Sequence, residues 1–102
     1  MIKILLLPLL AALALPTAVN AESDELGVAK IQFPRIKMLS ENATKFFEME
    51  DYYAACNKQR QANSLIEINF EGLQEMRPEF DWFIYRKLGL QLEELACIMV
   101  DQ

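Results

Sequence analysis

The sequence predicts an all-α protein, a small bundle or hairpin of three or four helices that follows a signal peptide. Apolar side chains recur at steps of three and four residues in the last quarter of the chain, which is the period of an amphipathic helix. Alanine and aromatic residues are spaced as in helices between Ala43 and Ala62. Only one short run, residues 66–70, alternates as a strand would.

The first 21 residues are predicted to be a cleavable secretory signal. Lys3 precedes an apolar run over residues 4–15, and residues 18–21 (AVNA) place small side chains before a cut at Glu22. An uncleaved membrane anchor is the alternative, but the run is shorter than the roughly 20 apolar residues that span a bilayer. We therefore expect the protein to be exported or secreted, with no stable membrane anchor after cleavage.

The chain that remains after this cleavage is acidic and short. It carries 9 Lys plus Arg against 15 Asp plus Glu, a net charge of −6, because Lys3 is the only charged residue of the leader. Nucleic acids and anionic lipid surfaces require a basic face, so neither is an expected partner. Eighty-one residues form one domain with a small core, for which a covalent cross-link matters.

Residues 22–35 are expected to be a mobile acidic lead-in, because Gly27 and Pro34 interrupt them and no period is sustained. Residues 36–102 are expected to form the helical domain. Its first helix is predicted from about Ile36 to Met49, and Ser40 is expected to be an N-cap with Glu41 in the first turn after it.

A second helix is predicted over residues 51–68, since the Asp51 carboxylate can accept from free amides of the first turn. The alternation at residues 66–70 leaves helix and strand open for its end. A connection that holds up to one helical turn follows. Pro78 suits the first position of a third helix, where the missing N–H costs nothing.

The third helix has the clearest period, and its apolar stripe is expected to face the core. Gly89 leaves open whether this segment is one helix or two shorter ones. The stripe consists of Phe80, Ile84, Leu88, Leu92, Leu95 and Met99.

Cys56 and Cys97 are predicted to form a disulfide, because an exported protein meets an oxidising compartment and the count is even. On a straight helix, Cys97 points away from the stripe. Either the second helix packs against that side, or the third helix ends near Leu95 and residues 96–100 turn inward. Two separate thiols are the remaining alternative.

The sequence contains no histidine, which excludes histidine-based nucleophiles, metal sites and acid–base catalysis. We expect no enzyme activity and no cofactor or metal. The expected function is a protein-interaction module with an unknown protein partner. The alternatives are a carrier of a small apolar or aromatic ligand and, third, a small helical enzyme. The candidate interaction or core aromatics are Tyr52, Tyr53, Trp82 and Tyr85.

Two resemblances to known proteins accompany this interpretation. The pattern Ala43-x-x-Phe46-Phe47, followed by residues 51–55 (DYYAA), resembles the helical hairpin of tetratricopeptide repeats. It departs from that family at Gln59, and an ordinary helical hairpin gives the same pattern. Residues 5–21 resemble signal peptides of small exported proteins of unknown function in marine cyanobacteria. That resemblance implies a periplasm or thylakoid lumen and no activity.

Overall fold

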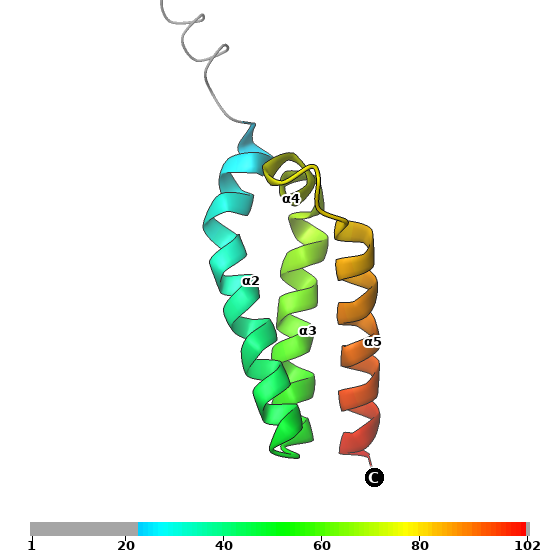
Figure 1. Ribbon diagram of the computed structural model, residues 1–102. Coiled ribbons are helices and arrows are strands. Elements are labelled where there is room, and N and C mark those ends of the chain that lie inside the picture. The colour runs from blue at the N-terminus through cyan, green and yellow to red at the C-terminus, as the bar shows by residue number, and fades with distance from the viewer. Residues whose placement is uncertain (1–22, 102) are drawn as a thin grey trace, which may run out of the picture.

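The computed structural model describes residues 23–101, which form four α-helices and no strand (Figure 1). The helices are α2 (Asp24–Glu48), α3 (Tyr52–Ile68), α4 (Phe70–Met76) and α5 (Trp82–Val100). The predicted all-α fold is confirmed, and residues 66–70 are helical except for the break at Asn69. The predicted signal peptide, residues 1–21, lies outside the described residues.

The three long helices lie in one layer with α3 in the middle, between α2 and α5 (Figure 1). Both α2 and α5 are antiparallel to α3. The short helix α4 lies at the end of the layer where α3 ends, and it packs mainly on α2. One edge of the layer is therefore formed by α5 alone, because α5 packs chiefly on α3.

α2 begins at Asp24 rather than near Ile36, so the expected lead-in is helical. The Ser23 hydroxyl accepts from the Leu26 amide at 2.9 Å and caps the helix. Acidic residues follow in the first turn, where they stabilise the positive end of the helix dipole. The capping signal at Ser23 therefore starts the helix, and residues 24–35, which were expected to be irregular, belong to α2.

Tertiary packing explains why the helix continues through Pro34, which removes one backbone hydrogen bond. Ala29 and Ile36, on either side of Pro34, are completely buried. The free energy gained by burying these side chains outweighs the cost of the backbone hydrogen bond that Pro34 removes. Ser40 consequently lies inside α2, where its carbonyl oxygen accepts from the Thr44 hydroxyl at 3.1 Å, and it does not cap a helix as expected.

The turn between α2 and α3 is a Schellman motif. Glu50 has a φ of 63°, in the left-handed region that helix C-termini commonly use. Its amide donates to Phe47 O at 3.0 Å and the Asp51 amide donates to Phe46 O at 2.9 Å. The Asp51 carboxylate then accepts from the Ala54 amide at 3.2 Å, which confirms its predicted role as the cap of α3.

α5 begins at Trp82, because the Asp81 carboxylate accepts from the Ile84 amide at 3.0 Å and caps the helix. Pro78 lies in the connection before it and not at the first helical position that the sequence predicted. Gly89 does not interrupt α5, which is continuous to Val100.

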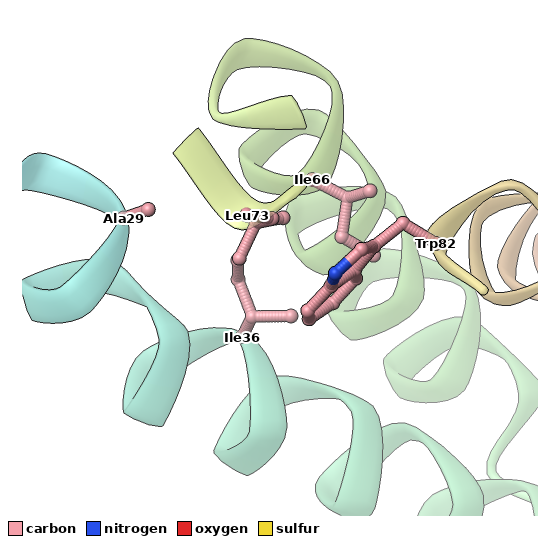
Figure 2. Packing of buried hydrophobic residues seen from close by; sticks show 5 residues of the cluster. All are labelled: Ala29, Ile36, Ile66, Leu73 and Trp82. Carbon is pink, nitrogen blue, oxygen red and sulfur yellow. The ribbon is translucent and has the colours of Figure 1, made fainter. Parts of the chain in front are cut away.

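The main hydrophobic core lies at the α4 end of the layer, where all four helices meet (Figure 2). Trp82 is 2% exposed, and its ring lies edge-to-face with that of Phe33 at a centroid distance of 5.7 Å. The Trp82 indole N–H donates to Arg77 O at 3.0 Å, which satisfies its polar atom. The buried members are Ala29, Ile36, Ile66, Leu73 and Trp82.

Candidate functional site

Along most of its length α5 packs on α3 through the small residues Gly89 and Ala96, and not through its predicted apolar stripe; at its start, Trp82 enters the main core. The buried residues of α5 are Trp82, Gly89 and Ala96, spaced seven residues apart. The absence of a side chain at Gly89 lets the Asn63 amide nitrogen approach the Gly89 carbonyl oxygen to 2.9 Å. Because large side chains would hold the two helices further apart, the small residues face α3 and turn the larger ones outward.

The expectation that the stripe faces the core is therefore wrong. Four of its members on α5 are about half exposed: Ile84 (54%), Leu88 (52%), Leu92 (46%) and Leu95 (49%). We call these four residues the apolar face. Scattered exposed leucines are ordinary, but a contiguous row along one helix is typical of an interaction surface.

Buried amides link α3 to α5 beneath this face. The Gln59 amide nitrogen donates to the Asn63 side-chain oxygen at 3.0 Å. The Asn63 amide nitrogen also donates to a Glu93 carboxylate oxygen at 2.8 Å. Gln59 and Asn63 are both buried. Because buried amides require partners, this network fixes the register of α5 on α3.

The disulfide between Cys56 and Cys97 joins the same two helices near their other ends. The two Cα atoms are 4.8 Å apart, within the usual range for a disulfide. The predicted bridge is confirmed. Of the two geometries considered for it, the structure has the first, since α5 stays helical beyond Leu95 and α3 packs against the side that carries Cys97.

A groove runs between α2 and α5, with α3 as its floor. It consists of two adjoining hollows of about 200 and 190 Å³ that share Thr44, Gln59 and Leu92. The first hollow is also lined by Ala43, Phe47, Glu48, Ala55 and Ala96. The second is also lined by Ser40, Ile66, Tyr85, Leu88 and Gly89. Leu88 and Leu92 of the apolar face thus form the α5 wall of the groove.

The opposite side of α3 is mostly polar. Asn57, Gln61 and Ser64 are exposed there at helical spacing. Ile68, 77% exposed, ends the same line of side chains, so the polar part of this side is the stretch from Asn57 to Ser64.

The four candidate aromatics lie at two ends of the layer. Tyr52 packs edge-to-face on Phe47 with a centroid distance of 5.2 Å, and Tyr53 is exposed nearby on α3. Trp82 belongs to the core at the other end. Only Tyr85 among the four lines the groove. They do not form one site.

The sequence interpretation did not identify the groove, because it placed the wrong side of α5 against the core. The available signal was the pair Gly89 and Ala96, two small residues seven positions apart, which is typical of a close helix contact. Among residues 23–101, no three His, Cys, Asp or Glu side chains are grouped to hold a metal ion. Within the same residues, no helix has the length and apolar character of a membrane span.

Comparisons with protein-family models, with curated proteins and with solved structures found no match to this chain.

Proposed function

We propose that this protein is an exported interaction module that binds an amphipathic helix of a protein partner along the apolar face. The observation that carries the proposal is the half exposure of four large aliphatic side chains in a row on α5. Burying the exposed half of each side chain against a partner contributes about 1 kcal/mol to the free energy of binding, so the four residues together contribute about 4 kcal/mol. The Cys56–Cys97 disulfide supports the oxidising compartment that export implies.

A helix fits this surface better than a small molecule does. The apolar face extends over about 16 Å from Ile84 to Leu95 at the helical rise. Its residues follow one another at steps of four, four and three positions, so they lie along one side of α5, as the apolar anchors of a helix that binds another helix do. Each hollow of the groove, at about 200 Å³, is smaller than the roughly 300–1,000 Å³ of typical ligand pockets, and only the two adjoining hollows together reach the lower part of that range. Binding of a small apolar ligand is therefore the second candidate.

The double substitution Leu88→Glu and Leu92→Glu is expected to abolish partner binding, because two charges would have to be buried against the partner. The measurement is a crosslinking pull-down from the native exported compartment, with protein identification by mass spectrometry. The matched control is Gln61→Glu with Ser64→Glu, on the polar side of α3, which should retain the partner.

Equal recovery of the partner by both double variants would refute the proposal. A small molecule seen by native mass spectrometry on the wild-type protein but lost from the variant would favour the carrier function instead.

A further inference from the structure

We propose that the helix bound by the apolar face is α5 of a second copy of this chain, packed antiparallel about a twofold axis. The proposal rests on the proposed function, because it names the occupant of the same face. Three observations carry it: the spacing of the outward residues of α5, its position at the edge of the layer, and two charges on one flank that have no ion-pair partner in the described part of the chain.

The outward residues of α5 follow the spacing of a coiled-coil seam. Ile84, Leu88, Gln91, Leu95 and Ile98 alternate in steps of four and three residues. This alternation keeps one line of side chains toward a partner helix over several turns. All five are exposed. The single polar member, Gln91, lies at the centre of the row, and such a residue commonly fixes the register of a helix pair.

The position of α5 leaves this seam accessible. α5 forms one edge of the layer, with α3 against its other side (Figure 1). A second copy can approach from outside the layer without displacing α2 or α3. Tyr85 and Leu92 lie beside the seam and line the groove, so the incoming helix also covers the α5 wall of the groove.

The charges select the antiparallel orientation. Lys87 and Glu94 lie on the other flank of the seam, seven residues apart and both exposed. Neither has an ion-pair partner among residues 23–101. When the twofold axis is level with residue 90, Lys87 of each copy faces Glu94 of the other. Flanking charges of this kind set the partner and orientation of paired helices.

A parallel pair does not use these charges. It would bring the Lys87 flank of one helix against the Leu92 flank of the other, and would leave both ion-pairing groups without partners. In the antiparallel register, Ile84 packs against Leu95 of the second copy and Leu88 against Gln91. One surface therefore complements itself in shape and in charge, as a twofold interface requires.

The test is sedimentation equilibrium of the processed protein with its disulfide intact. We expect a monomer–dimer equilibrium in the wild type and a monomer for Leu88→Glu. Lys87→Glu and Glu94→Lys should each weaken the dimer, raising Kd by about tenfold through two like-charge contacts. The double exchange Lys87→Glu with Glu94→Lys should restore the wild-type Kd. Lys45→Glu, an equal charge change on α2, should leave Kd unchanged.

Two results overturn the inference. One is a wild-type protein that stays monomeric at every concentration. The other is a variant with both Lys87→Glu and Glu94→Lys whose Kd is higher than that of either single variant, instead of returning to the wild-type value. Circular dichroism of each variant shows whether the helices are retained, as expected because the substituted side chains are exposed. If the wild type is monomeric, the pull-down with Leu88→Glu and Leu92→Glu still decides the proposed function on its own.

Discussion

Replacement of both cysteines by serine is expected to lower the free energy of unfolding by about 4 kcal/mol. Cys56 and Cys97 are 41 residues apart in sequence, so the bridge closes a loop that contains most of α3, all of α4 and most of α5. Its loss mainly increases the conformational entropy of the unfolded chain. A domain of this size has a total stability of only about 5–10 kcal/mol, so the effect is a large share of it.

Urea unfolding monitored by circular dichroism measures this change. Reduction of the wild-type disulfide serves as the control and should shift the unfolding midpoint to that of the Cys56→Ser, Cys97→Ser variant. A loss of less than about 1 kcal/mol would contradict the prediction, and would mean that the cross-link is not needed to hold α5 against α3.

Gly72→Ala is expected to destabilise the protein by about 3 kcal/mol, because α2 and α4 are in backbone contact at this point. A Cβ atom on Gly72 would overlap the Glu25 carbonyl oxygen and would lie 2.9 Å from the Ala29 Cβ. Backbone atoms of a helix cannot rotate away as a side chain does, so the two helices must separate. The core beside them, which contains Ala29 and Leu73, would then be opened.

A loss of stability in Gly72→Ala, rather than a gain, would show that α2 and α4 are closely packed at this position. On helical propensity alone, glycine to alanine stabilises an exposed helix interior by about 1 kcal/mol. Glu71→Ala, at the exposed neighbouring position in α4, is the matched control and should change stability little. Thermal unfolding of both variants decides the matter, and a Gly72→Ala protein at least as stable as the wild type would refute the contact.

Local signals in the sequence were sufficient where one side chain determines an element. Asp51 marks the start of α3 because its carboxylate caps the free amides there. The start of α2 had a comparable signal at Ser23, but Gly27 and Pro34 obscured it. Their local cost is outweighed by the burial of Ala29 and Ile36 against the other helices. Those partners are distant in sequence, so inspection of the segment alone could not reveal them.

The orientation of α5 required more than its hydrophobic period. Ile84, Leu88 and Leu92 form the most regular apolar row in the chain, and such a row usually faces the core. Here the opposite side, with Gly89 and Ala96, packs closer to α3 than a leucine row could. The helix consequently carries two apolar sides, and within residues 23–101 only one of them packs along another helix.

Photo-crosslinking tests most directly whether the second side is a binding surface. A photoreactive amino acid replaces Leu92 on the apolar face in one variant and Ser64 on the polar side of α3 in another. Both are expressed in the native exported compartment and irradiated. We expect a protein adduct, either with a second copy or with another chain, at position 92 and none at position 64. No adduct at position 92, or equal adducts at both positions, would contradict it.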